Sequence, residues 1–358
     1  MPADRRAERQ RALAAALEAD GLDALVVQHL PNIRYLTGFT GSAGILVVRA
    51  AGSVLLTDFR YAVQAPQEAG AAAQIEIETV NLWDRLRRLL GADEAVGFEA
   101  HVATVRDAKR LGEGRTHPPV ATSDMVERLR VRKAPEEVEA IRAAAVLAQE
   151  ALAEVLPTVR IGESELAIGA RLESALRHRG SEWHPFPTIV ASGPRSALPH
   201  ARTSARPVAA GEFLLIDFGA QLNGYCSDLT RTVVLGKADE RQRAVYELVE
   251  AAQLRACEGI RAGQTGREAD ALARDPIVQR GFGEAFGHSL GHGLGLEVHE
   301  APRLSPTADT PLPAGAVVTI EPGIYLPGWG GVRLEDDVYL GPAGSECLSD
   351  GRTALVEL

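Results

Sequence analysis

The segment 213–235 places two carboxylates in strand-like sequence on either side of a tight-turn signal, and this pattern restricts the fold more than any other. The apolar runs of this segment flank Asn223-Gly224, a dipeptide that strongly predicts a two-residue hairpin turn. A turn centred on Asn223-Gly224 would put Asp217 and Asp228 on a diagonal, and a turn centred one residue earlier would put them directly opposite. Both alternatives bring the two side chains together.

Asp217 has Leu215 and Ile216 before it and Phe218 after it. Burying a lone carboxylate among such side chains costs several kcal/mol unless the carboxylate is paired or binds a metal ion. The alternative is an edge hairpin that carries both carboxylates on the surface. The apolar flanks favour the buried arrangement.

A second acidic pair repeats this arrangement further along the chain. Glu321 lies in the run 317–325 and Glu335 in the run 332–338, on either side of a glycine-rich loop. A hairpin centred near Gly328 places Glu321 opposite Glu335. Four converging carboxylates would repel one another and raise one another's pKa values unless cations neutralised them.

Three histidines, His288, His292 and His299, lie in the glycine-rich stretch 287–300 between the two acidic pairs. A lone histidine is more often an ordinary core or surface residue, but three beside four carboxylates favour a metal site. An oxygen-rich set with one imidazole suits two divalent metal ions, Mn²⁺ first, with Co²⁺ or Zn²⁺ as alternatives. Two ions sharing carboxylates would generate a hydroxide near neutral pH and polarise a carbonyl, so the residues predict metal-assisted hydrolysis.

Two other motifs have simpler explanations. Gly287-His-Ser-Leu-Gly291 fits the nucleophile elbow of α/β-hydrolases, which needs an acid and then a histidine later in the chain. The last histidine is His299, and no aspartate lies between it and Ser289, so a serine hydrolase is not expected. The run 38–44 lacks the lysine and the following helix of a phosphate loop, and we interpret it as a turn between strands.

Strand-like and helix-like segments alternate in the first third of the chain, which predicts an α/β domain over residues 1–125. The basic stretch 126–134 is interpreted as a linker. Pro135 suits the first position of a helix that should end near Val155. The other expected elements are helices at 5–19, 61–69, 82–90 and 104–112, and strands at 24–27, 44–48, 54–57, 74–80 and 95–99.

Residues 135–358 contain a short internal repeat. The segments 160–164 and 261–265 each follow one helical pattern and precede another. Each has a glycine suited to end a helix and a serine or threonine suited to begin the next. We therefore predict an α+β domain made of two similar halves, each of which supplies one acidic pair.

The composition excludes several functions. A formal net charge of -10 argues against a nucleic-acid-binding surface. No apolar run approaches the roughly 20 residues that span a bilayer, and the first residues do not form the apolar core of a signal peptide. Cys226, Cys257 and Cys347 lie far apart and are expected to be reduced. We predict a cytoplasmic protein that binds neither nucleic acid nor membranes.

At the residues that carry these patterns the chain resembles the pita-bread metallopeptidases, and most of all their Xaa-Pro branch, aminopeptidase P and prolidase. The resemblance covers nearly the whole chain. It implies a creatinase-like α/β N-terminal domain, a pita-bread α+β catalytic domain with an internal duplication, and a homodimer. The matching segments are Ile216–Gly219, Ser227–Thr232, Gly287–Glu300, Ile320–Gly323 and Arg333–Asp336, with Tyr35–Gly44 and Leu56–Tyr61 in the N-terminal part.

The resemblance also implies roles for the ligands. Asp217 would chelate one metal ion, and Asp228 and Glu335 would bridge both ions. His292 and Glu321 would hold the other ion. Glu321 would also act as general base, so that a metal-bridging hydroxide attacks the peptide bond.

Three histidines outside the ligand set match the family's outer histidines: His200, His288 and His299. In the family these residues position the scissile carbonyl, stabilise the tetrahedral intermediate or shuttle a proton. The alternative for His288 is a hydrogen-bonding role behind the ligands.

Five further residues are carried over as substrate-binding or supporting groups. Phe186 and Val298 would form apolar walls of the substrate pocket. Arg303 would meet a substrate carboxylate, with an ordinary surface arginine as the alternative. Tyr325 and Arg333 would support the glutamates.

The implied reaction is hydrolysis of the N-terminal Xaa-Pro bond in peptides with proline at position two. That bond is a tertiary amide without the N–H that other peptidases bind. We place an aminopeptidase P-like activity first, prolidase restricted to dipeptides second, and a non-catalytic dimeric binding protein of the same fold as a remote alternative. Creatinase lacks the metal ligands and methionine aminopeptidase lacks the long N-terminal domain, so neither fits.

Overall fold

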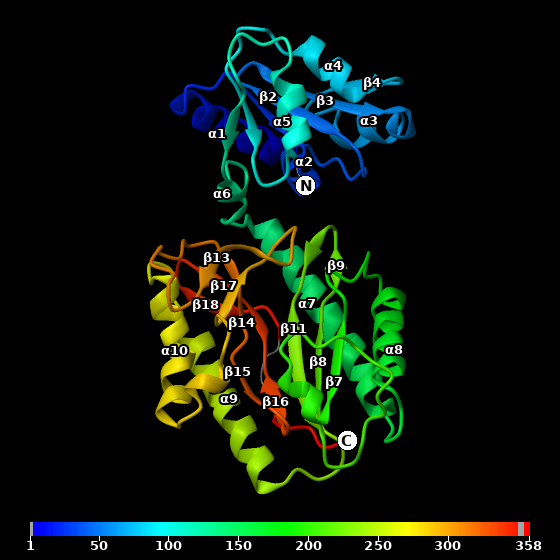
Figure 1. The fold of residues 1–358 in the computed structure, drawn as a ribbon, viewed down its shortest axis with the longest axis vertical. Coiled ribbons are helices and arrows are strands. Elements are labelled where there is room, and N and C mark those ends of the chain that lie inside the picture. The colour runs from blue at the N-terminus through cyan, green and yellow to red at the C-terminus, as the bar shows by residue number, and fades with distance from the viewer. Residues whose placement is uncertain (1–2, 350–353) are drawn as a thin grey trace. The chain divides into compact units, whose positions relative to one another are not determined.

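The computed structural model describes residues 3–349 and 354–358. The chain divides into two compact units, one ending at Arg130 and the other beginning at Val131, and each is described by itself (Figure 1). The interval 126–134, interpreted above as a linker, contains the short helix α6 (Glu127–Arg130), which is part of the first unit. In the described part of the chain, no helix is both long enough and apolar enough to cross a membrane.

The first unit is built on a six-stranded sheet with the strand order β4-β3-β2-β1-β5-β6. The central strand β1 pairs antiparallel with β2 and parallel with β5, so the sheet is mixed. Its strands are β1 (Ala24–Val27), β2 (Ile45–Arg49), β3 (Gly52–Asp58), β4 (Gln74–Glu78), β5 (Val96–Glu99) and β6 (Val120–Thr122). Besides α6, its helices are α1 (Ala3–Ala19), α2 (Leu30–Thr37), α3 (Gln64–Ala69), α4 (Leu82–Leu89) and α5 (Val105–Gly112).

The helices and strands expected in residues 5–112 are present, with bounds shifted by a few residues, and the helix expected at 61–69 is preceded by a 3₁₀ turn at Phe59–Tyr61. Helix α2 is additional to the expected elements. It starts with Pro31 in its first turn and stops at Gly38, which has φ 85°. The run 38–44 therefore joins a helix to β2, and its interpretation as a turn between strands is wrong. A helix of 8 residues is too short for its periodicity to be distinguished from a buried strand.

The second unit consists of two halves, each with a sheet covered by two helices (Figure 1). The strand orders are β11-β8-β7 in the first half and β13-β12-β14-β17-β18 in the second. The first half contains α7 (Pro135–Val155), α8 (Glu165–His178), β7 (Ile189–Ser192), β8 (Phe213–Phe218), β9 (Gln221–Leu222), β10 (Tyr225–Cys226) and β11 (Leu229–Val234). The second half contains α9 (Glu240–Gly259), α10 (Gly266–Gln279), β12 (Gly291–Gly293), β13 (Glu300–Leu304), β14 (Val317–Ile320), β15 (Gly323–Leu326), β16 (Gly330–Arg333), β17 (Asp336–Gly341) and β18 (Gly344–Cys347).

The predicted internal duplication is confirmed by matching hydrogen bonds in the two halves. Gly162 and Gly263 have φ values of 88° and 92°, and each donates its N–H to a carbonyl over 2.8 Å. Ser164 and Thr265 then cap α8 and α10 with their side-chain oxygens. Helix α7 begins and ends where the sequence predicts.

Candidate metal centre

Asp217 and Asp228 come from the two sides of the first hairpin. The register of β8 and β11 pairs Asp217 with Thr230, and the short β9–β10 ladder continues the same register. Asn223 and Gly224 have φ values of 51° and 78°, which suit the two central positions of a type I′ turn. The turn is thus centred on this dipeptide, and the two carboxylates lie on a diagonal. The alternative in which they are directly opposite is wrong.

Glu321 and Glu335 come from the second hairpin. The β14–β17 ladder ends with Ile320 opposite Asp336, and the β15–β16 ladder resumes the same register beyond it. The two glutamates therefore face each other in the gap between the ladders, as predicted from a turn near Gly328.

Thr230 joins the two hairpins. It is opposite Asp217 in the first hairpin and forms an isolated bridge with Glu335 of the second. The N–H of Glu335 donates to the carbonyl of Thr230 over 3.1 Å, and Thr230 Oγ1 donates to Glu335 Oε2 over 2.6 Å. Threonine is common in strands, so the sequence does not signal this role.

His292 lies at the centre of β12 and directs one ring nitrogen towards the carboxylates. Its Nδ1 lies 3.1 Å from the carbonyl oxygen of Gly293, which can only accept, so Nδ1 carries the proton. Nε2 then offers its lone pair 3.4 Å from Glu321 Oε1 and 3.8 Å from Asp228 Oδ2. Burial lowers the pKa of His292 to about 4, so the ring is neutral at neutral pH, the form that binds metals.

The glycine before His292 allows β12 to lie close to β14. A Cβ on Gly291 would overlap the carbonyl oxygen of Thr319, whereas a Cβ on Gly287 would meet nothing within 4 Å. We therefore expect Gly291→Ala to lower the free energy of unfolding by about 1–3 kcal/mol through overpacking. Gly287→Ala, the matched control, should change it by less than about 1 kcal/mol. Urea unfolding measures both variants, and equal effects would contradict the close-approach explanation.

Asp228 and Glu335 are buried, Asp217 and Glu321 are largely buried, and among the four carboxylates only Asp217 is paired with an arginine in the described structure, Arg333. Burial raises the pKa of Asp217, and it raises the pKa of Glu321 to about 8. The pKa values of Asp228 and Glu335 are raised further, first by burial and then by the charges of the neighbouring carboxylates. Cations among these groups would remove the repulsion.

The donor set fits divalent cations. Asp228, His292 and Glu335 each offer a ligand atom, and these atoms lie within 4.8 Å of one another. Oδ1 of Asp217 is buried and has no hydrogen-bond partner among the described residues. With Glu321, four carboxylates and one neutral imidazole converge, a combination suited to hard or borderline divalent ions.

Arg333 and Tyr325 form a chain of hydrogen bonds that links Asp217 to His288. Nη2 of Arg333 donates to Asp217 Oδ2 over 2.6 Å, and Nη1 donates to the Tyr325 hydroxyl over 2.8 Å. That hydroxyl donates to His288 Nε2 over 2.9 Å, and His288 Nδ1 donates to the Ser289 carbonyl over 2.8 Å. Burial lowers the pKa of His288 to about 4, so its ring is neutral. Both ring nitrogens of His288 are engaged, which favours its supporting role.

A buried ion pair behind Glu335 has no counterpart in the sequence prediction. Nη2 of Arg231 donates to Asp336 Oδ1 over 2.7 Å, and Nη1 donates to the Glu335 carbonyl over 2.6 Å. Gln253 of α9 donates to Asp336 Oδ2 over 2.6 Å. The pair therefore fixes the backbone that carries Glu335. An arginine inside the expected strand 229–234 is the signal that could have indicated it.

A cavity of about 750 Å³ opens onto these residues. His200, His299 and Arg303 are exposed on its wall. Val298 and Tyr325 are not wall residues, and Tyr325 acts through the hydrogen bonds described above. The predicted site residues on the wall are Phe186, His200, Asp217, Asp228, His288, His292, His299, Arg303, Glu321, Arg333 and Glu335.

Two family models match the chain. The model described as metallopeptidase family M24 matches residues 139–342, which include the whole cluster of carboxylates and histidines. The model described as the creatinase/prolidase N-terminal domain matches residues 9–132. Together they cover most of both compact units.

Full-length relatives show the same relationship. An Xaa-Pro dipeptidase of Pyrococcus horikoshii is 33% identical over 98% of this chain and 99% of its own length. A solved structure of an Xaa-Pro dipeptidase from Bacillus anthracis is 40% identical, with a TM-score of 0.95 over 99% of this chain and 100% of that one. An X-Pro aminopeptidase structure from Thermotoga maritima is 36% identical, with a TM-score of 0.89 over 98% and 99%.

Proposed function

Because this chain belongs to metallopeptidase family M24, we propose that it hydrolyses the peptide bond between an N-terminal residue and proline, with Xaa-Pro dipeptides as its first substrates. The observation that carries the proposal is the group of four carboxylates, two of them buried and two largely buried, with a neutral imidazole on the wall of one cavity. This group suits metal-assisted hydrolysis. The preference for proline is supported by the names of the full-length relatives.

Asp217, Asp228, His292, Glu321 and Glu335 would hold two divalent cations. Bound cations would supply Lewis acidity, which polarises a carbonyl and lowers the pKa of water. Glu321, whose carboxylate bound cations would keep ionised, would take the proton of the attacking water. It would pass that proton to the proline nitrogen as the peptide bond breaks.

The three outer histidines would have different roles, because their side chains differ in exposure and in hydrogen bonding. His200 and His299 are exposed on the cavity wall, where each can donate a hydrogen bond to the substrate. His288 would act as a positioning residue, because its two ring nitrogens already bond to Ser289 and Tyr325.

Arg303 supports dipeptides as the first substrate class. It is opposite His292 in the β12–β13 ladder, and its exposed side chain lies on the cavity wall. The carboxylate of a dipeptide is one residue from the scissile bond, so a cation close to the metal ligands favours short substrates. This position and the dipeptidase names lead us to place prolidase before aminopeptidase, the reverse of the order expected from sequence.

Arg303→Ala is expected to raise KM for Ala-Pro about tenfold, equivalent to about 1.4 kcal/mol, with little change in kcat. The reason is that the variant loses the attraction for the substrate carboxylate. Ala-Pro amide, which lacks that carboxylate, is the matched control and should show no change in KM. An equal effect on both substrates in steady-state kinetics would contradict the role of Arg303.

The proposed function is tested with purified protein loaded with Mn²⁺ and three substrates. We expect hydrolysis of Ala-Pro and none of Ala-Ala. Faster hydrolysis of Ala-Pro-Ala than of Ala-Pro would favour the aminopeptidase alternative. Metal-loaded protein that cleaves neither proline peptide would overturn the proposal.

Three narrower expectations belong to the same proposal. We propose Mn²⁺ as the working metal, with Co²⁺ or Zn²⁺ as alternatives, a homodimer as the assembly, and the cytoplasm as the location. Activity after reloading with each ion tests the first, and light scattering during size-exclusion chromatography tests the second.

A further inference from the structure

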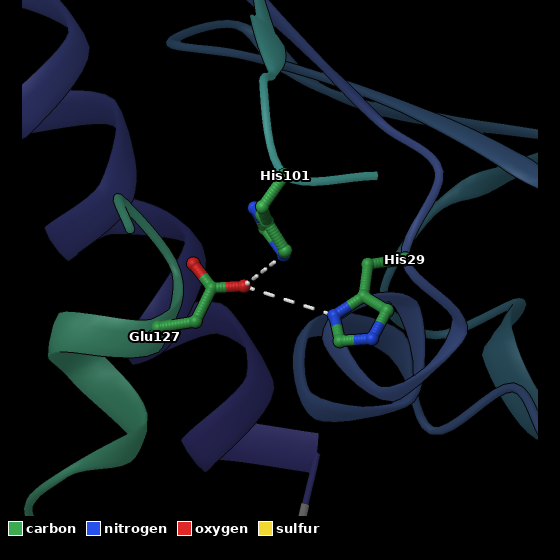
Figure 2. A group of neighbouring side chains, drawn as sticks. All are labelled: His29, His101 and Glu127. Atoms are coloured by element: carbon green, nitrogen blue, oxygen red, sulfur yellow. Dashed lines mark ion pairs between the residues drawn. The ribbon is translucent and has the colours of Figure 1, made fainter. Parts of the chain in front are cut away.

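Three segments of the first unit bring two imidazoles and a carboxylate together. His29 follows β1, His101 follows β5, and Glu127 is the first residue of α6 (Figure 2). His29 Nδ1 lies 3.7 Å from Glu127 Oε1, and His101 Nε2 lies 3.2 Å from the same oxygen. The three ligand atoms all lie within 4.8 Å of one another. None of these residues takes part in the proposed hydrolysis.

The three residues offer ligand types that divalent metal ions use. Glu127 supplies a carboxylate oxygen, and His29 and His101 each supply a ring nitrogen. A bound metal ion takes such groups as a deprotonated carboxylate and neutral imidazoles.

A hydrogen-bond network behind the cluster fixes the directions of its side chains. Asn32 Nδ2 donates to Glu127 Oε1 over 2.5 Å and to Glu99 Oε1 over 2.6 Å. Nη1 of Arg130 donates to Asn32 Oδ1 over 2.7 Å, which fixes the orientation of the amide. Glu99 Oε2 accepts the backbone N–H of His29 over 2.8 Å. Contacts of this kind hold ligands in place around metal ions in proteins.

We propose that His29, His101 and Glu127 bind a zinc-type divalent cation, with a fourth position left for water. Two imidazoles and one carboxylate are a ligand set that zinc uses, with bonds of roughly 2.0–2.2 Å. Two ligands on a tetrahedral ion are then about 3.3 Å apart. The distance of 3.2 Å between His101 and Glu127 already fits, and the distance of 3.7 Å to His29 needs a small side-chain rotation. The side chain of His101 is 38% exposed, which gives the ion a path from solvent.

The bound ion would connect three segments that are distant in the sequence. It would attach α6, the last helix of the first unit, to the connections that leave the carboxyl ends of β1 and β5. Binding to the folded state alone stabilises a protein in proportion to the logarithm of ligand concentration. Zinc should therefore raise the thermal stability of the first unit.

The test uses the full chain carrying Asp228→Asn and Glu335→Gln, two substitutions that are expected to prevent metal binding at the candidate metal centre. Titration with Zn²⁺ against a chromophoric chelator should show one bound equivalent per chain. Adding His101→Asn should remove it, and adding His117→Asn, an exposed histidine of the same unit, should leave it. No bound zinc in the chain carrying Asp228→Asn and Glu335→Gln, or equal binding by the two histidine variants, would overturn the proposal.

A second measurement tests the proposed zinc site in a chain without Asp228→Asn and Glu335→Gln. In an otherwise unaltered chain, His29→Asn or His101→Asn should lower the zinc content by one equivalent, with Ala-Pro hydrolysis retained. Circular dichroism reports whether each variant is folded. A folded His101→Asn variant with the zinc content of the wild type would mean that the cluster is only a histidine–glutamate pair, which contradicts the proposal. Because this readout is zinc content, it is separate from a failure of the proposed hydrolysis.

Discussion

Asp228→Asn is expected to abolish hydrolysis and, at the same time, to stabilise the metal-free protein. A carboxylate oxygen of Asp228 lies within 4.8 Å of a ring nitrogen of His292 and of a carboxylate oxygen of Glu335. Loss of groups that merely orient metal ligands costs about 10–100-fold in affinity or activity, so loss of Asp228, which we propose as a ligand shared by both ions, should lower kcat/KM by at least about a thousandfold. Steady-state kinetics with Ala-Pro and Mn²⁺ measures this loss.

The expected stabilisation of the metal-free protein comes from the loss of electrostatic repulsion among the carboxylates. Burial, followed by the charges of Asp217 and Glu321, raises the pKa of Asp228 well above its ordinary value. An amide of the same shape removes that repulsion, so the melting temperature of Asp228→Asn in the presence of a chelator should exceed that of the wild type.

Asp336→Asn is the matched control for this prediction. Asp336 is equally buried, but it is paired with Arg231, and breaking such a pair leaves a buried charge without compensation. This variant should melt at a lower temperature than the wild type with or without Mn²⁺. A lower melting temperature of Asp228→Asn in chelator would show that the carboxylates do not repel one another as described.

The metal-free protein is expected to lose stability as the pH rises from about 6.5 to 8, the range set by the ordinary pKa of histidine and the pKa of Glu321. In the folded state the pKa of Glu321 is about 8 instead of 4.5, so between these values the folded state binds more protons than the unfolded state. Stability must then fall with increasing pH, by up to about 1.4 kcal/mol per pH unit for each such group. The raised pKa values of Asp217, Asp228 and Glu335 act in the same direction.

The lower limit of that range comes from the histidines of the site, among which His299 also has a pKa lowered by burial. His288 and His292 have pKa values near 4 in the folded state instead of 6.5, so below pH 6.5 they make stability rise with pH and oppose the carboxylates. Urea unfolding between pH 6.5 and 8 measures the net slope, in which the histidine contribution fades as the histidines of the unfolded chain lose their protons. Mn²⁺ should abolish the slope, and Glu321→Gln should reduce it. Stability that rises with pH in chelator would contradict this account.

Local sequence predicts the two hairpins because strand pairing around a tight turn is a local property. Asn223-Gly224 determines the register of the first hairpin once both residues adopt positive φ. In the second hairpin the paired residues are placed symmetrically around Gly328. Each acidic pair could therefore be recognised from residues close to one another in the chain. The choice between a diagonal and a direct arrangement required the observed turn.

Contacts between distant segments could not be predicted in this way. Thr230 and Glu335 are brought together only by the meeting of two hairpins. His29 and His101 become neighbours because β1 and β5 are adjacent parallel strands, whose carboxyl ends meet at one edge of the sheet. Strand order is set by the packing of the whole unit, and no spacing in the sequence encodes it. Helix α2 is not predictable for another reason, since its 8 residues give too little periodicity.

The duplication described above also has a consequence for the symmetry of the centre. Gly263 and Gly162, which make equivalent hydrogen bonds in the two halves, are 101 positions apart. By the same interval, the position in the first half that corresponds to His292 is Ala191. A symmetrical pair of identical chains would present two copies of one acidic hairpin with no difference between them. A single chain that contains both halves can carry different residues in each, and here the imidazole is supplied by the second half alone. The duplication therefore permits a centre whose two ends are chemically unequal.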